Sequence, residues 1–142
     1  MKLINTIIRI VNEEVYSPAS DEYTPKKFIT HVSNPFFRND IKLTGLQTSV
    51  GECYQLYVNK DQTLNDKIKC RPAIFATDSL DKEFIFDSTY DDDIWIIDTE
   101  CAGVTWYKDR HYGGYYKHHI VTFDNIPLNC IKLIYKGTGE SY

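Results

Sequence analysis

The sequence lacks most of the short motifs that identify an enzyme or a metal protein. Its four cysteines are scattered without any C-x-x-C pair, so neither a zinc ribbon nor a disulfide framework is indicated. We expect free, mostly buried thiols at Cys53, Cys70, Cys101 and Cys130. No glycine-rich phosphate loop and no nucleophile elbow is present, and no run approaches the roughly 20 apolar residues that a membrane span requires.

A strong charge of either sign is also missing. Against 20 Asp and Glu stand 16 Lys and Arg, which gives a net charge of -4. This balance argues against an overall electrostatic grip on nucleic acid or on an anionic membrane, but it leaves a local basic patch for nucleic acid open. The opening MKLINTIIRIVNEE is too interrupted by Asn5 and Arg9 to be a signal peptide. We therefore expect a cytoplasmic protein without a membrane partner.

Strand-forming residues are abundant. The chain has 11 tyrosines and 14% aromatic residues, which favour strands and binding surfaces. Turn residues separate strand-like segments at 73–77, 83–86, 93–98, 104–107, 118–123 and 130–137. The length of 142 residues suits one domain, 1–142, and no repeat or composition break divides it. The sequence predicts a strand-rich α+β fold.

The helical signals lie in the first half. Apolar residues of segment 2–10 recur at helical spacing, with a strand as the rival interpretation. Segment 28–33 is typical of a strand, after which Asn34 and Pro35 open a short helix that runs towards Leu43 and stops at Gly45. A strand at 54–58 follows, and then a polar connection at 59–70 that is the best candidate for a mobile loop.

Three segments in order resemble the ADP-ribosyltransferase superfamily. FITHVS at 28–33, with the short helix and the Gly45–Leu46 exit behind it, resembles the H-G-[ST] opening signature, with Val32 in place of the glycine. AIFATDS at 73–79 resembles the Y-F-A strand, and KHHIVTFDNIPLNCIKLIYK at 117–136 resembles the last two strands. The resemblance implies a split β-sheet core with one or two short N-terminal helices. It also implies a cleft between two small sheets that binds NAD, as substrate, or a related nucleotide.

The resemblance carries roles over to particular residues. His31 takes the place of the histidine that contacts a ribose hydroxyl, and Ser33 takes the place of the residue that contacts the nicotinamide amide. Alternation along a strand directs both side chains to one face. Ile74 stands where the family has an aromatic residue that stacks on nicotinamide, with Phe75 next to it. Tyr54 is a further candidate for substrate contact.

His118 stands where the family has its catalytic glutamate. A histidine cannot supply the fixed negative charge that stabilises an oxocarbenium-like transition state, so transfer activity is expected to be lost or altered. Asp98 or Glu100 could replace the missing acid. Some members of the superfamily, the tRNA 2′-phosphotransferases, work without the glutamate and hold a phosphate with basic residues. The corresponding phosphate cradle here would use Arg110, His111, Lys117, His118 and His119. Arg38 and Arg71 would substitute for the arginines that the phosphotransferases have early in the chain.

Other polar clusters have simpler interpretations. Adjacent His118 and His119 would point to opposite faces of a strand, which argues against a zinc site, and we expect no metal. RHYGGYYKHH at 110–119 instead suits an aromatic, basic loop that stacks on a base or meets a protein. DSTYDDD at 87–93 is typical of an acidic, solvated turn.

Two function classes follow. The first is an ADP-ribosyltransferase-like protein that binds a nucleotide ligand, with His31 and His118 facing a common groove that segment 59–70 covers. The second is a noncatalytic phage or bacterial structural or inhibitor module that binds a protein partner through a tyrosine-rich surface. If core side chains fill the groove at His31, the second class takes precedence.

Overall fold

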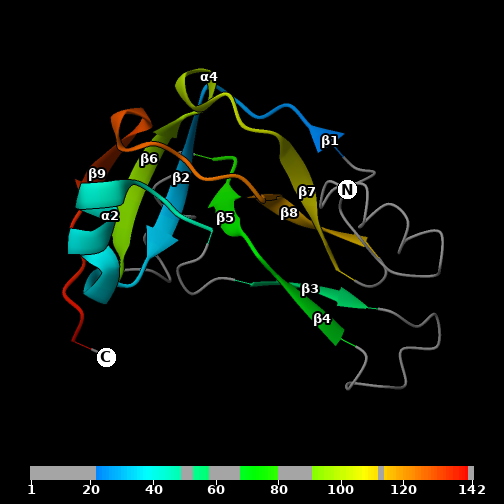
Figure 1. Ribbon diagram of the computed structural model, residues 1–142, viewed down its shortest axis with the longest axis horizontal. Coiled ribbons are helices and arrows are strands. Elements are labelled where there is room, and N and C mark those ends of the chain that lie inside the picture. Colours follow the sequence, from blue (N-terminus) through cyan, green and yellow to red (C-terminus); the bar gives the residue numbers. More distant parts are fainter. Residues whose placement is uncertain (1–21, 49–52, 58–67, 80–90, 112–113, 141–142) are drawn as a thin grey trace.

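The structure is a computed structural model that describes residues 22–48, 53–57, 68–79, 91–111 and 114–140. Most of the described strands belong to one antiparallel sheet with the strand order β1-β7-β8-β5-β2-β6-β9 (Figure 1). The strands of this seven-stranded sheet are β1 (Glu22–Tyr23), β2 (Phe28–Ser33), β5 (Ile74–Thr77), β6 (Asp93–Asp98), β7 (Trp106–His111), β8 (Gly114–Thr122) and β9 (Ile131–Tyr135). Strands β3 (Cys53–Tyr57) and β4 (Ile68–Pro72) form a separate antiparallel pair.

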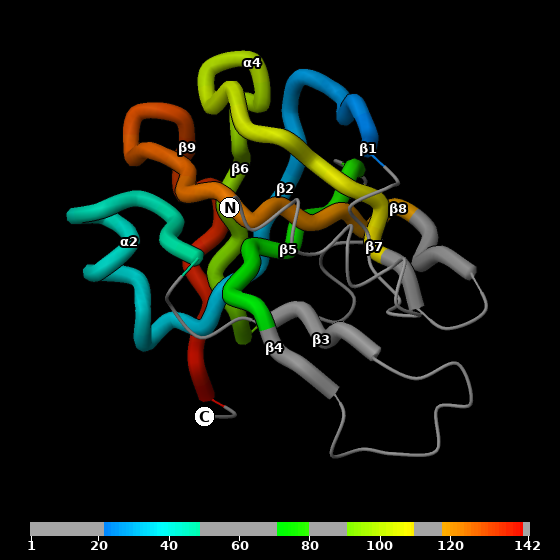
Figure 2. Tube along the Cα trace, turned by 45° about the vertical axis from the view of Figure 1, so that its right-hand side comes forward, coloured from blue at the N-terminus to red at the C-terminus, as the bar shows by residue number. Residues whose placement is uncertain are grey.

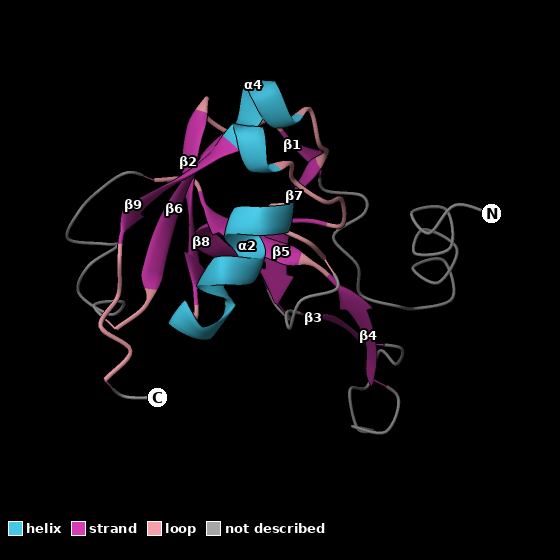
Figure 3. Ribbon diagram, turned by 60° about the vertical axis from the view of Figure 1, so that its left-hand side comes forward, coloured by secondary structure: helices cyan, strands magenta, loops and turns pink. Residues whose placement is uncertain are grey.

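The described helices are short. They are η2 (Pro35–Phe37), α2 (Arg38–Thr44), α4 (Thr99–Ala102) and η4 (Leu128–Cys130). Figure 3 shows α2 in front of the central strands, with α4 at one end of the sheet. The described part of the chain is thus a strand-rich α+β structure with little helix.

The helix predicted after Asn34 is confirmed, because local signals define both of its ends. The side chain of Asn34 accepts a hydrogen bond from the Phe36 backbone at 2.9 Å, and Pro35 is the first helical residue. Gly45 ends the helix with φ of 84°. A Cβ at Gly45 would lie 2.4 Å from the carbonyl oxygen of Ile126, so both the backbone conformation and the close packing require glycine.

The central strands are those that carry the family resemblance. Strand β5 lies between β2 and β8, so segments 28–33, 73–77 and 118–123 contribute neighbouring strands. We expected two small sheets, but all three strands belong to the same seven-stranded sheet. The backbone of residues 68–70 is part of β4, which corrects the prediction of a loop there. The predicted elements at 2–10 and 83–86 and residues 58–67 lie outside the described residues.

The core lies on one face of the sheet. Side chains that alternate along the central strands pack together there, among them Ile29, Ile74, Ala76, Trp95, Ile97, Trp106 and Ile120. Ile41 from α2, Leu46 and Ile126 extend this cluster. The bridge between Leu46 and Ile126, with hydrogen bonds of 2.8 and 2.9 Å, fixes the exit of α2 on the segment before β9.

The prediction of free thiols is wrong for two of the four cysteines. Cys101 on α4 and Cys130 on η4 form a disulfide, with their Cα atoms 5.5 Å apart. Figures 1 and 2 show why these distant positions meet: α4 and the loop before β9 lie side by side at one end of the sheet. Cysteine spacing along the chain holds no information about this proximity. The side chains of Cys53 and Cys70 lie outside the described residues.

Candidate functional site

His31 belongs to the interior of the protein. It is only 3% exposed and lies on β2 opposite Trp95 of β6. Its Nδ1 lies 2.5 Å from the carbonyl oxygen of Phe75. Because a carbonyl can only accept, Nδ1 carries the proton and the imidazole has a defined tautomer. Burial lowers the pKa of His31, and the hydrogen bond to Phe75 opposes this only in part.

The residues predicted to accompany His31 do not form an open cleft with it. Ile74 is part of the buried core. Ser33 is half-buried, and its hydroxyl accepts a hydrogen bond of 2.9 Å from Nε1 of Trp95. Phe75 is half-buried, and its backbone holds His31. The side chain of Tyr54 on β3 lies outside the described residues. Core side chains therefore fill the region where the nucleotide cleft was expected.

His118 has a different environment. It is exposed and has φ of 66°, a left-handed conformation that non-glycine residues seldom adopt. Its carbonyl accepts a hydrogen bond of 2.7 Å from the backbone of Asp78. His119 is exposed as well, and its Nδ1 lies 3.8 Å from Asp109. His31 and His118 thus differ in exposure, and the expectation that both line one open groove is wrong because His31 is enclosed.

The acids and bases considered as substitutes are engaged in other contacts. Asp98 caps α4 by accepting hydrogen bonds of 3.1 Å from Glu100 and Cys101. Glu100 is 3.4 Å from Lys27 in an exposed ion pair. Arg71 lies over the ring of Phe123, with 4.5 Å between its guanidinium carbon and the ring centroid, and burial lowers its pKa. The side chains of Arg110, His111 and Lys117 lie outside the described residues.

Arg38 and Asp93 form a buried ion pair that the sequence did not predict. Two guanidinium nitrogens of Arg38 donate to the two carboxylate oxygens of Asp93, each at 2.6 Å. Asp93 also accepts from the backbone of Gly137 at 2.8 Å, and Arg38 donates to the Gly137 carbonyl at 3.2 Å. The Asp93 side chain is fully buried, so the solvated turn predicted for 87–93 is wrong at its last residue. The pair attaches α2 to the sheet.

The helical segment that this pair attaches has an apolar outer surface. Phe36 is 75% exposed and Leu43 is 79% exposed, and Phe37 is also exposed. Leu128 on η4, which packs against α2, is a fourth exposed apolar side chain. We call these four residues the η2–α2 surface. Phe36 on η2 and Leu43 on α2, seven residues further along the chain, are both exposed, whereas Ile41 of α2 is buried. This spacing could have been read from the predicted helix.

Burial of His31 predicts a pH-dependent stability. An unfolded chain protonates this histidine near pH 6.5, whereas the folded chain keeps it neutral to lower pH. Below that pH the unfolded state binds more protons, so the free energy of unfolding falls by at most about 1.4 kcal/mol per pH unit for one histidine. Above it, the stability is fully present. His119, whose pKa is lowered by burial and by His118, acts in the same direction.

Urea unfolding at pH 7.5 and pH 5.5 measures this effect. We expect His31→Gln, which cannot titrate but retains a donor for the Phe75 carbonyl, to lose less stability than the wild type between the two values. His119→Gln is the comparison variant, and we expect it to reduce the pH dependence less than His31→Gln does, because His119 is exposed and His31 is buried. An unchanged pH dependence in His31→Gln would show that His31 is not held neutral in the fold.

Comparison of the chain with known protein families finds no match, and neither does comparison with curated proteins. The resemblance to ADP-ribosyltransferases therefore stays a prediction. Within the described ranges, no helix is long and apolar enough to cross a membrane. No group of three or more His, Cys, Asp or Glu side chains that could hold a metal occurs in the same part of the chain.

Proposed function

We propose that this protein is a noncatalytic module that binds a protein partner through the η2–α2 surface. The observation that carries the proposal is the exposure of Phe36 and Leu43, at 75% and 79%, on a helical segment that is firmly attached to the sheet. Large exposed apolar side chains on a short helical segment are the kind of anchor that inserts into an apolar groove of a partner. We therefore expect the partner to present such a groove.

The attachment of the helix favours tight binding. The buried pair of Arg38 and Asp93 holds its beginning, and Gly45 packs against the backbone of Ile126 and Leu128 at its end. A surface that is already ordered loses little conformational entropy on association. Interfaces also concentrate their binding energy in a few large anchors. The η2–α2 surface combines both properties, and it is therefore our candidate interface.

The double variant Phe36→Ser/Leu43→Ser tests this proposal. We expect at least a tenfold loss of partner binding with an almost unchanged melting temperature, because exposed side chains contribute little to folding. The measurement is affinity capture from an extract of the cells that express the protein, with the retained proteins identified by mass spectrometry. Ile134→Ser is the matched control, because Ile134 is an exposed apolar side chain of β9 on the face opposite to Leu133, which packs against the core.

The pattern of retention decides the outcome. A protein retained by the wild type and by Ile134→Ser but lost with the double variant is the expected partner, and its affinity is then measured with purified components. If all three baits retain the same proteins, the η2–α2 surface is not the interface. Sedimentation at several concentrations identifies the case in which the bound partner is a second copy of this chain.

A nucleotide-binding, ADP-ribosyltransferase-like protein is the second candidate. It is favoured by the adjacency of β2, β5 and β8, the strands that carry the resemblance. Calorimetric titration with NAD and with ADP-ribose distinguishes the two candidates. The binding-module proposal expects no heat from either ligand, because His31 is buried and bonded to Phe75. Saturable heat that disappears in His31→Ala would favour the nucleotide-binding candidate instead.

A further inference from the structure

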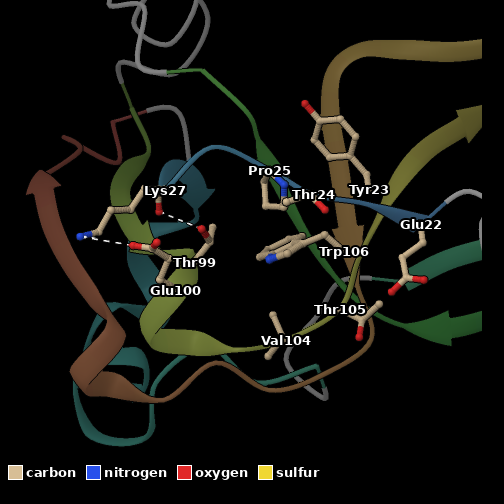
Figure 4. Close-up of a pocket in the computed structure, with 10 residues that line it drawn as sticks. All are labelled: Glu22, Tyr23, Thr24, Pro25, Lys27, Thr99, Glu100, Val104, Thr105 and Trp106. Atoms are coloured by element: carbon tan, nitrogen blue, oxygen red, sulfur yellow. Dashed lines mark hydrogen bonds and ion pairs between the residues drawn. The ribbon is translucent and has the colours of Figure 1, made fainter.

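A pocket separate from the η2–α2 surface lies between the β1–β2 connection, the beginning of α4 and the beginning of β7 (Figure 4). Its volume is about 550 Å³, within the range of small-molecule sites in proteins. The lining includes Glu22, Thr24, Lys27, Glu100, Thr105 and Trp106. None of these residues belongs to the site that the sequence predicted except Glu100, which was considered as a substitute acid.

The walls of the pocket are held in place by polar contacts. The hydroxyl of Tyr23 donates to Asp78, and the backbone of Lys26 donates to the same carboxylate at 3.1 Å. On the opposite side, the backbone of Thr99 donates to the Lys27 carbonyl at 2.8 Å, and the Thr99 hydroxyl donates to the Lys26 carbonyl at 2.8 Å. The connection between β1 and β2 is thus anchored from both sides, which preforms the pocket.

Trp106 gives the pocket an uncommitted hydrogen-bond donor. The residue is 2% exposed, and its Nε1 has no hydrogen-bond partner within the described structure. Figure 4 shows its indole ring among the lining residues, with the nitrogen on the side that faces Thr99 and Glu100. A buried donor without a partner destabilises the fold, because it has lost its hydrogen bonds to water. The other tryptophan, Trp95, has no such cost, because its Nε1 donates to Ser33 at 2.9 Å.

The charges around Trp106 are mostly negative. Glu22 lies on one side of the indole, and the pair of Lys27 and Glu100 lies on the other (Figure 4). Lys27, the cation of the lining, is 3.4 Å from Glu100 and also lies over the Phe28 ring at 5.2 Å. Glu22 has no ion pair within the described part of the chain. The lining can therefore pair with an additional positive charge of a ligand through Glu22. Its cation, Lys27, is already paired with Glu100, so the lining does not favour an anionic ligand.

We propose that this pocket binds a short peptide with a free amino terminus. A peptide carbonyl accepts the hydrogen bond of Trp106 Nε1, and the terminal ammonium pairs with the Glu22 carboxylate. In the described structure, Trp106 Nε1 has no hydrogen-bond partner and Glu22 has no ion pair, and both residues line the preformed pocket. This site is independent of the η2–α2 surface, so it stands whether or not that surface binds a protein.

The two indole N–H signals in an NMR spectrum of the ¹⁵N-labelled full chain test the proposal. The probe is trialanine amide, which has a free ammonium group. We expect a saturable downfield shift of the Trp106 signal, with the Trp95 signal unchanged because its donor stays on Ser33. Either Trp106→Phe or Trp95→Phe assigns both signals, so the assignment does not depend on the folding of one variant.

The charge requirement has its own controls. N-acetyl-trialanine amide lacks the ammonium group, and we expect about tenfold weaker binding, the equivalent of about 1.4 kcal/mol for one charged contact. Glu22→Gln should weaken the binding of trialanine amide by a similar factor. Glu140→Gln, which lies outside the pocket, should leave that binding unchanged. An unmoved Trp106 signal, equal shifts of both indoles, equal affinity for the acetylated peptide, or tighter binding of ADP-ribose would each overturn the proposal.

Discussion

Replacement of Arg38 by methionine is expected to lower the free energy of unfolding by about 3–5 kcal/mol, the cost of leaving a buried charge without its partner. The Asp93 side chain is fully buried, and that of Arg38 is 16% exposed. Methionine retains much of the apolar stem but removes both 2.6 Å contacts to the carboxylate. The hydrogen bond from the Gly137 backbone remains and compensates only part of the loss.

A double-mutant cycle separates the charge from the packing. Asp93→Asn removes the negative charge, so we expect Arg38→Met/Asp93→Asn to be more stable than Arg38→Met alone. Lys27→Met is the matched control, since its ion pair with Glu100 is exposed and should contribute less than about 1 kcal/mol. Urea unfolding is measured for the four proteins of the cycle and for Lys27→Met. If the effects of Arg38→Met and Asp93→Asn simply add, the two side chains are not coupled and the structural interpretation is wrong.

This ion pair also connects stability to the proposed function. It holds the first turn of α2 against the sheet, so its loss should disorder the segment that presents Phe36. We therefore expect Arg38→Met to weaken partner binding even at temperatures where the protein stays folded. Lys27→Met should not affect that binding.

Removal of the disulfide between Cys101 and Cys130 is expected to cost about 3.5 kcal/mol, from the closure entropy of a loop with a sequence separation of 29. The bond connects two short helices whose own backbone hydrogen bonds are few, since α4 has 4 residues and η4 has 3. Without the link, the unfolded chain gains freedom and α4 loses its covalent attachment to η4.

Unfolding of the double variant Cys101→Ser/Cys130→Ala measures this cost. Serine suits the exposed position 101 and alanine the buried position 130. The wild type should respond to a reductant more strongly than the variant does, because any remaining response comes from Cys53 and Cys70. Alkylation of the folded protein without reductant gives the direct test. Modification of Cys101 under those conditions would show that the bond is not formed.

The same experiment examines the location expected from the sequence. Reducing conditions in the cytoplasm keep most cysteines as free thiols, whereas stable disulfides are typical of oxidising compartments. Isolation of the protein from its own cells under acid quenching preserves the redox state of Cys101 and Cys130. Free thiols in that sample would agree with the cytoplasmic prediction, and a closed bond would argue for an oxidising compartment.

The sequence by itself determined the elements whose signals are local. Asn34, Pro35 and Gly45 set the beginning and the end of the helical segment, because caps and left-handed terminators act within a few residues. Strand-forming residues bounded by turn residues likewise predicted the strands at 28–33 and 93–98 with their observed bounds. These predictions needed no knowledge of the rest of the chain.

Only the tertiary structure decided which faces and which distant residues meet. Alternation placed His31 and Ser33 on one side of β2, but it could not tell that this side is the core, since that depends on β5 and β6 as neighbours. The pair of Arg38 and Asp93 joins positions 55 residues apart, and the disulfide joins positions 29 apart. Such contacts depend on the order of the strands in the sheet, which no local signal encodes, because a side chain's chemistry is the same whichever partner the fold brings to it.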